Sequence, residues 1–143
     1  MDNRQLTFSH LLYLTAHHWR LAVNRRLKNL GLSQAIWVAV ASIARPQQPL
    51  SQSALAQELG VESPTIVPLI HRLVALGLVE RVTTASDKRK RLLVVTDKGK
   101  ALYEQVKTVA DDLREEILTA ITPQEQEQTQ RVLEKLLREV EKK

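Results

Sequence analysis

Residues 50–96 have the sequence LSQSALAQELGVESPTIVPLIHRLVALGLVERVTTASDKRKRLLVVT, and this stretch decides the fold. Its opening predicts a helix with a defined start and end. Ser51 can cap that helix because its hydroxyl can accept from a free N–H of the first turn. Leu50 and Leu55 can form a hydrophobic staple across the cap. Gly60 ends the helix, since glycine adopts the left-handed conformation without a Cβ clash.

A second helix is predicted from Ser63 to Leu76. Ser63 is a favoured N-cap residue. Pro64 suits the first helical position, because the N–H that it lacks would be unpaired there. Gly77 ends this helix as Gly60 ends the first. Two helices joined by so short a turn must cross at a steep angle, so the pair predicts a helix-turn-helix.

The second helix has two chemically distinct faces. Its apolar residues follow the i, i+3, i+4, i+7 spacing of a core-facing stripe, and they are Ile66, Leu69, Ile70 and Leu73. The other face carries Pro64, Thr65, Pro68, His71, Arg72 and Ala75. Because that face has no acidic residue, it could enter a DNA major groove, where Arg72 could reach a phosphate or a guanine edge. Considered alone, it could equally be a solvated surface.

Residues 78–83 and 92–95 have the composition of β-strands and predict a hairpin. A short extended segment near Leu50 is expected to pair with it as a third strand. The tip of the hairpin carries four consecutive basic residues, which are well placed to follow a phosphate backbone. The helix and the basic tip together predict DNA binding. The predicted DNA-contacting residues are Ser53, Ser63, Pro64, Thr65, Pro68, His71, Arg72, Lys88, Arg89, Lys90 and Arg91.

Three motifs in this region resemble those of the MarR family of winged-helix transcription regulators. They are Gly77-Leu78-Val79-Glu80-Arg81, Asp87-Lys88-Arg89 and Val95-Thr96-Asp97-Lys98-Gly99. Upstream, Trp19-Arg20, Arg26-Leu27-Lys28, and Leu32-Ser33-Gln34 with Trp37 are similar to the SlyA branch of that family. The likeness covers nearly the whole chain. It implies a winged helix-turn-helix whose wing is the predicted hairpin.

Two positions depart from the family pattern. Val95 stands where leucine is usual, and Pro68 stands where a polar residue or arginine is common, so one base contact of the family is not carried over. A proline in a helix interior costs about 3 kcal/mol, so a bend or a widened turn is expected over residues 65–68. The ring of Pro68 could contact a thymine methyl but could not read guanine. Specificity is therefore expected to depend more on DNA shape.

The composition is that of a globular protein, with 143 residues of which 43% are hydrophobic and 26% are charged. This length is enough for one domain with a real core. The chain has no cysteine, which excludes a disulfide framework and a thiol redox switch. No signal-peptide pattern is present, and no stretch approaches about 18 apolar residues. We expect a soluble cytoplasmic protein with no membrane partner.

Positive charge is concentrated over the proposed recognition helix and wing. The net charge is +5, from 21 basic and 16 acidic residues. Residues 1–62 hold six basic and three acidic residues, residues 63–100 hold eight and three, and residues 101–143 hold seven and ten. A basic region on a neutral-to-acidic body is the electrostatic pattern expected of a DNA-binding protein.

Long amphipathic helices are predicted on both sides of the helix-turn-helix. They cover residues 5–30 and 33–44 before it, and residues 97–120 and about 123–140 after it. A capping box, Thr122-Pro123-Gln124-Glu125, begins the last one. Its inward residues are expected to be Val132, Leu133, Leu136, Leu137 and Val140. A winged helix alone could not cover the apolar stripes of these helices, so we expect a two-fold dimer in which they interlock. Packing on their own domain is the alternative.

The predicted fold class is mainly α (α+β), with residues 1–143 as a single domain. Residues 32–96 would form the winged helix-turn-helix lobe. Residues 5–30 and 97–141 would be dimerisation helices that form an intertwined lobe. Two recognition helices would then face two half-sites about one helical turn apart on a roughly palindromic operator.

Nothing in the sequence predicts catalysis, since there is no phosphate-binding glycine loop and no nucleophile motif. We expect no enzyme activity and no cofactor. His17 and His18 are adjacent, so on a helix they diverge by about 100° and do not readily share a metal ion. With no cysteine and no His-x-x-x-His pair, no metal site is predicted. His71 is expected to touch the DNA backbone or to be simply exposed.

Trp19 and Trp37 have two interpretations. Both can be packing residues of a core or an interface. The resemblance to the SlyA branch implies instead a cleft for a small aromatic carboxylate, with His17, Trp19, Arg20 and Trp37 as the candidate residues. These would offer a cation and a flat apolar wall, although Arg20 could equally form a structural ion pair. Such a ligand would favour a dimer whose recognition helices are wrongly spaced for the operator.

The sequence therefore predicts a homodimeric, sequence-specific DNA-binding transcriptional regulator, either a repressor or an activator, that a small aromatic or anionic ligand modulates. Its partner would be double-stranded DNA. A winged-helix module for protein–protein contact is one alternative, but it would not need the basic hairpin tip. A nonspecific architectural DNA-binding protein is another, and the ratio of specific to nonspecific affinity would distinguish it.

Overall fold

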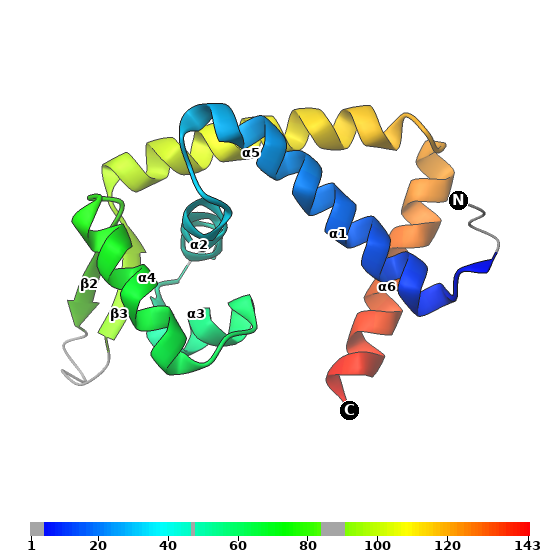
Figure 1. Ribbon diagram of the computed structural model, residues 1–143. Coiled ribbons are helices and arrows are strands. Elements are labelled where there is room, and N and C mark those ends of the chain that lie inside the picture. The colour runs from blue at the N-terminus through cyan, green and yellow to red at the C-terminus, as the bar shows by residue number, and fades with distance from the viewer. Residues whose placement is uncertain (1–4, 47, 84–90) are drawn as a thin grey trace. The chain divides into compact units, whose positions relative to one another are not determined.

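The computed structural model describes residues 5–46, 48–83 and 91–143, which are mostly helical with one small sheet (Figure 1). The elements in chain order are α1 (Phe8–Leu27), a 3-10 turn η2 (Lys28–Leu30), α2 (Gln34–Ala44), β1 (Leu50–Ser51), α3 (Gln52–Leu59), α4 (Ser63–Ala75), β2 (Val79–Thr83), β3 (Arg91–Val95), α5 (Asp97–Leu118) and α6 (Pro123–Glu141). The chain divides into two compact units, Met1–Val109 and Ala110–Lys143. The predicted fold class, mainly helical with a winged helix-turn-helix, is confirmed.

The helix-turn-helix consists of α3 and α4, and the limits predicted for α3 are confirmed. Ser51 caps α3, with its Oγ accepting from the N–H of Ala54 at 3.1 Å. Gly60 ends α3 in the left-handed conformation, with φ 70°. The N–H of Val61 then donates to the carbonyl of Ala56 at 3.0 Å, which closes the last turn.

The predicted N-cap of α4 is wrong by one residue. Glu62 is the N-cap, with φ −70° and ψ 148°, and Ser63 is the first helical residue. The N–H of Thr65 donates to the carbonyl of Glu62 at 2.9 Å, so the helical turn already begins there. Pro64 occupies the second position, where its missing N–H would also be unpaired. The widened turn expected at Pro68 does not form, because α4 is a single α-helix through this residue.

The sheet has three antiparallel strands in the order β1-β3-β2. β2 and β3 are the predicted hairpin, with Thr83 opposite Arg91. The extended segment expected near Leu50 is β1, with Leu50 opposite Leu93. β3 is therefore the central strand, and its Leu93 has no exposed surface. The sheet attaches the hairpin to the start of the helix-turn-helix.

One hydrophobic core joins α2, α3, α4 and the sheet. Its side chains without exposed surface include Ala39, Val40, Leu55, Ile70, Leu73 and Leu93. The predicted inward face of α4 is confirmed for Ile66, Ile70 and Leu73, whereas Leu69 is half-buried. Burial of one such side chain is worth about 1.5–3 kcal/mol. These residues together fix which side of α4 faces outward.

The end of α4 is attached to the start of α5 by hydrogen bonds around Gly77, which has φ 74°. Thr96 Oγ1 donates to the carbonyl of Gly77 at 2.6 Å and accepts from the N–H of Gly99 at 3.0 Å. Lys98 Nζ donates to the carbonyl of Leu76 at 2.8 Å. Carbonyls at a helix end have no partner within the helix. Residues 96–98 therefore supply donors for the carbonyl of the C-cap residue Leu76 and for that of Gly77, which follows it.

Gly99 lies directly against the backbone of Leu78. A Cβ at position 99 would be 2.1 Å from the carbonyl oxygen of Leu78 and 3.1 Å from the Cβ of Val95. The same carbonyl accepts from the N–H of Thr96 at 3.1 Å, so it is not free to shift. The spacing of Thr96 and Gly99, which is part of the family resemblance, therefore has a physical reason in this chain.

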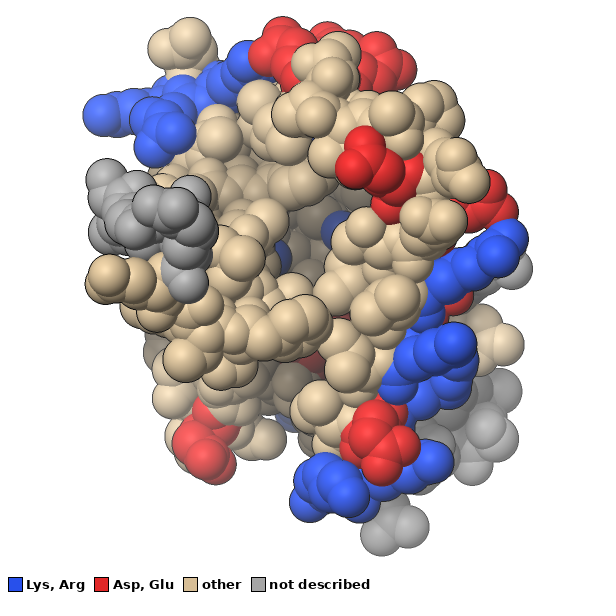
Figure 2. Space-filling view, turned by 90° about the vertical axis from the view of Figure 1, so that its right-hand side faces the viewer, with Lys and Arg blue, Asp and Glu red and all other residues tan. Residues whose placement is uncertain are grey.

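The long flanking helices leave apolar residues uncovered. α1 buries Val23 and Leu27 near its end, whereas the large exposed hydrophobic residues of its first half are Phe8, Leu11, Leu12 and Tyr13. Figure 2 views the molecule from the side on which α1 begins in Figure 1, and much of the surface that faces the viewer carries no charged side chain. The first half of α1 therefore presents an apolar surface that the described part of its own unit does not cover.

α6 has no buried residue. The exposed hydrophobic residues of its stripe are Val132, Leu133, Leu137 and Val140. Leu136 is half-buried, so the stripe that was expected to face inward, with a partner chain covering it, is mostly exposed in the single chain. The periodicity is as predicted, but none of the described segments, 5–46, 48–83 and 91–143, buries the stripe.

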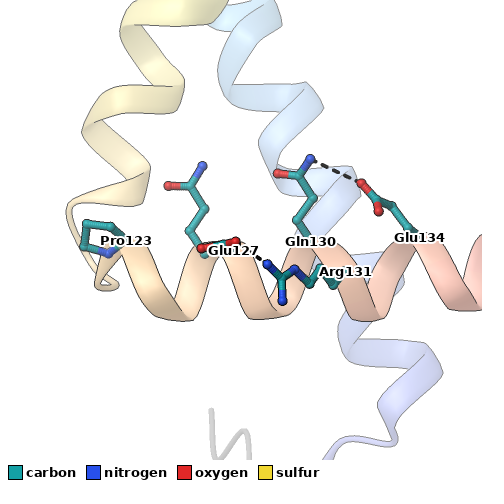
Figure 3. Close-up of a pocket in the computed structure, with 6 residues that line it drawn as sticks. Pro123, Glu127, Gln130, Arg131 and Glu134 are labelled. Carbon is teal, nitrogen blue, oxygen red and sulfur yellow. Dashed lines mark hydrogen bonds and ion pairs between the residues drawn. The ribbon is translucent and has the colours of Figure 1, made fainter.

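Another face of α6 is polar, and the predicted capping box at its start is confirmed. Thr122 and Glu125 bond reciprocally, each side chain accepting from the other's N–H at 3.0 Å. Figure 3 shows the polar side chains that follow, with Arg131 paired to Glu127 and Gln130 donating to Glu134 at 3.4 Å. α6 is thus strongly amphipathic.

Replacement of Gly99 by alanine is expected to destabilise the protein by about 2 kcal/mol or more. The new methyl group would overlap the carbonyl of Leu78, and overpacking costs roughly 1–3 kcal/mol even where the overlap is milder. The higher helix propensity of alanine would offset only about 1 kcal/mol of this loss. Urea unfolding followed by circular dichroism measures the difference. Lys100→Ala, at the next and exposed position, should change stability by less than about 0.5 kcal/mol. A Gly99→Ala protein as stable as its parent would contradict the close contact.

Candidate nucleic-acid interface

The outward face of α4 is fixed by the burial of its opposite face, on which Ile66, Ile70 and Leu73 lie in the core. The predicted contact residues of α4 are all exposed, namely Ser63, Pro64, Thr65, Pro68, His71 and Arg72. No residue of α4 is acidic, so this face would not repel phosphate. The nearest carboxylate in the sequence is that of the exposed N-cap residue Glu62.

Ser53, the predicted contact residue of α3, is exposed at the second position of that helix. Beside it, Gln52 Oε1 accepts from Arg81 Nε at 3.3 Å. This bond attaches the start of α3 to β2 in the wing and so positions Ser53 relative to the hairpin. Sequence reasoning missed the pair, because its members are 29 residues apart and only Arg81 lies in a motif.

The base of the wing is a regular antiparallel pair of strands. Arg91, at the start of β3, is exposed and lies opposite Thr83. The other three predicted wing cations, Lys88, Arg89 and Lys90, lie outside the described residues. The structure therefore describes Ser53, Arg91 and the outward face of α4 among the predicted contact residues.

A cavity of about 630 Å³ lies in the Met1–Val109 unit, among α1, α2, α3 and α4. The lining residues that bear on its chemistry are Arg20, Trp37, Arg45, Glu58, Thr65 and Leu69. The Cζ of Arg20 lies 5.6 Å from the centroid of the Trp37 ring, which is a cation–π contact. Trp37 Nε1 donates to Asn24 Oδ1 at 3.0 Å. The indole of Trp37 in α2 therefore contacts two residues of α1, Arg20 and Asn24.

The four candidate effector residues do not all meet at this cavity. Arg20 and Trp37 line it, whereas His17 and Trp19 are not among its lining residues. His17 stacks on Tyr13, with ring centroids 5.4 Å apart, and meets His18 edge-on at 5.5 Å. Trp19 is half-buried. Sequence reasoning did not predict that Thr65 and Leu69 of α4 would form a wall of the same cavity.

Across 5–46, 48–83 and 91–143, no group of three or more His, Cys, Asp or Glu side chains could hold a metal ion. In the same ranges, no single helix is long and apolar enough to cross a membrane. Phe8–Leu30 and Gln34–Ala44 reach the necessary length and apolar composition only when taken together, and the pair is bent by 101°. The second member of this pair contains α2, which is mostly buried in the core.

Comparisons with known proteins agree with this architecture. The model of the MarR family matches residues 30–90. The crystal structure of transcriptional regulator PA3341 is similar with a TM-score of 0.89 and 38% sequence identity, over 96% of this chain and 100% of that chain. Wild-type apo MarR from E. coli is similar with a TM-score of 0.77 and 26% identity, over 92% and 98% of the two chains. The S. aureus MepR–DNA complex has the same fold, with a TM-score of 0.78 and 23% identity over 94% and 99%. By its sequence and its fold, the chain belongs to the MarR family of transcriptional regulators.

Proposed function

We propose that this chain is a sequence-specific regulator that binds double-stranded DNA through α4 and its wing. The observation that carries the proposal is the exposed and acid-free face of α4, whose outward direction is set by the buried Ile66, Ile70 and Leu73. The basic run of residues 88–91 leads directly into β3. MepR, which shares the fold, has been solved in complex with DNA, and this supports the proposal.

Each contact residue has a role that fits its chemistry. Arg72 suits a guanine edge or a phosphate, and Thr65 suits either a base or a phosphate. Pro68 offers no donor, so its ring can contact a thymine methyl, and part of the specificity would come from DNA shape. The hydroxyl groups of Ser53 and Ser63, near the helix starts, and the imidazole of His71 could donate hydrogen bonds to phosphates. Pro64 has no N–H, so it would make only apolar contacts with the DNA backbone. The wing cations Lys88, Arg89, Lys90 and Arg91 would neutralise phosphates or reach into the minor groove.

The proposed regulator is a homodimer built from residues 5–30 and 97–141, with residues 32–96 as its DNA-binding lobe. The support comes from apolar side chains that the single chain leaves open, such as Phe8 and Val140 at 68% exposure and Leu137 at 59%. Exposed apolar patches of this kind mark interaction surfaces. A two-fold dimer would present two α4 helices to half-sites about 34 Å apart on a palindromic operator.

The proposal includes an effector, because three of the residues similar to the SlyA branch, Arg20, Gln34 and Trp37, line the cavity of about 630 Å³. This volume lies within the range of about 300–1,000 Å³ that is usual for small-molecule sites. Arg20 would supply a cation for a small aromatic carboxylate, and Trp37 would supply a flat apolar wall. The acid would also contact Thr65 and Leu69, so it would bind against the proposed recognition helix.

Selection of bound sites from random duplex DNA should yield a palindromic consensus, and Arg72→Ala should weaken binding to it. If Arg72 holds a phosphate, the slope of log affinity against log salt should become shallower by about 2 per dimer. If it reads guanine, discrimination at one base pair per half-site should fall by about 1–3 kcal/mol. Fluorescence anisotropy at several salt concentrations measures both quantities.

The matched control is Arg114→Ala, which removes the same charge from the acidic C-terminal part of the chain and should leave the slope unchanged. An Arg72→Ala protein with the parent's affinity, slope and base preference would remove α4 from the interface. Equal affinity of the parent for selected and random DNA would favour a nonspecific architectural role instead.

The double variant Leu133→Lys, Leu137→Lys should convert a dimer into monomers in sedimentation velocity experiments. In a dimer, the two lysine charges of each chain would be buried in an apolar interface without partners. The free energy of burying them would exceed that of leaving the stripe exposed in a monomer. The control is Gln126→Lys, Gln130→Lys on the polar face of α6, which adds the same charge and should leave the dimer intact. A parent protein that sediments as a monomer at micromolar concentration would disprove the dimer, and so would a double variant that dimerises like its parent.

Salicylate at millimolar concentration should quench tryptophan emission and weaken DNA binding, because its ring would lie against Trp37. The two tryptophans allow a clean test. Quenching should persist in Trp19→Phe, whose indole does not line the cavity, and should largely disappear in Trp37→Phe. An effect on DNA affinity that survives Arg20→Ala and Trp37→Phe would place the ligand elsewhere. A panel of aromatic acids without any effect would leave Trp37 as a packing residue only.

A further inference from the structure

A second cleft in the Met1–Val109 unit lies at the end of α4 and has a volume of about 320 Å³. Four leucines line it, namely Leu32, Leu76, Leu78 and Leu102. They come from the segment before α2, the end of α4, the turn before β2 and the second turn of α5. The polar residues of its lining are Lys98 and Gln105. None of its lining residues lines the cavity at Trp37 or belongs to the exposed stripes of α1 and α6.

Lys98 gives this apolar cleft a single positive charge, and none of its lining residues is acidic. The Nζ of Lys98 donates to the carbonyl of Leu76 at 2.8 Å, which holds the ammonium group beside the leucines. An ammonium group has three N–H donors. Two of them therefore remain for another acceptor while the bond to Leu76 is kept.

We propose that this cleft binds a small aliphatic monocarboxylate, with its carboxylate on Lys98 and its hydrocarbon part on the leucines. One cation matches one carboxylate, and the amide of Gln105 can donate a second hydrogen bond to it. The apolar lining is aliphatic, without an aromatic ring to stack on. The volume lies at the lower end of the range for ligand sites, which suits a short chain. Leu76 is 41% exposed, so its side chain is open to such a chain.

The test is a calorimetric titration of the full chain with sodium octanoate, below its micelle concentration and without DNA. We expect one saturable site per chain. Lys98→Gln should weaken octanoate binding at least tenfold, and Lys98→Arg should restore much of it. Lys100→Gln removes the same charge two residues away, at an exposed position outside the cleft, and should bind like the parent. Neutral 1-octanol should bind more weakly than octanoate to the parent and should be insensitive to Lys98→Gln.

A second variant tests the cleft while it leaves the hydrogen bond between Lys98 and Leu76 in place. Ala101 lines the cleft but is exposed, so Ala101→Phe should fill the cleft without loss of folding, which circular dichroism checks. It should abolish binding of octanoate and octanol alike.

Binding that is unsaturable, or that survives both Lys98→Gln and Ala101→Phe, would overturn the proposal. If salicylate displaces octanoate from the Lys98→Gln protein, octanoate binds in the cavity at Trp37, and the proposal is also overturned. None of these results bears on DNA binding by α4, so the two proposals fail separately.

Discussion

Two carbonyl groups at the end of α4 are the point on which the arrangement of the DNA-binding lobe depends. The last carbonyls of a helix have no partner within it. Here the carbonyl of the C-cap residue Leu76 accepts from Lys98 at 2.8 Å, and that of Gly77, directly after the cap, accepts from Thr96 at 2.6 Å. The same segment carries Gly99, whose missing side chain lets the backbone before β2 approach closely. The end of the recognition helix, the start of the wing and the first turn of α5 therefore meet at one place. The direction of α4 and the direction in which α5 leaves the lobe are set by the same few bonds.

Local signals predicted most of the fold, because a cap or a glycine stop depends on bonds within three or four residues. Ser51 and the outward face of α4 are where the sequence placed them. The N-cap of α4 shows the limit of such signals. It was predicted at Ser63 and is the adjacent Glu62, because a helix start shifted by one residue leaves the apolar spacing of the helix unchanged. Contacts between distant elements leave no such signal. The bond between Arg81 and Gln52 and the second cavity wall on α4 could be recognised only once the chain was folded.

Periodicity shows which face of a helix is apolar but not what covers it. α2 and α6 both carry apolar residues at helical spacing, yet most of α2 is buried and α6 has no buried residue. The difference lies in their neighbours, because α2 is enclosed by α3, α4 and the sheet within one core. The stripe of Leu133 and Leu137 was therefore predictable from the sequence, and so was the need for something beyond the winged helix to cover it, but its exposure residue by residue required the folded chain.

Thr65 belongs to two surfaces, because it is exposed on α4 and also lines the cavity at Trp37. A molecule in that cavity would touch the helix that we propose reads DNA. Equilibria coupled in this way are reciprocal, so a ligand that lowers the affinity for DNA by some factor is itself held more weakly by DNA-bound protein, by the same factor. Operator and ligand would then act as mutual antagonists. The occupancy of each operator would follow the balance between the two, and a cell with more operator copies would need more ligand to free them.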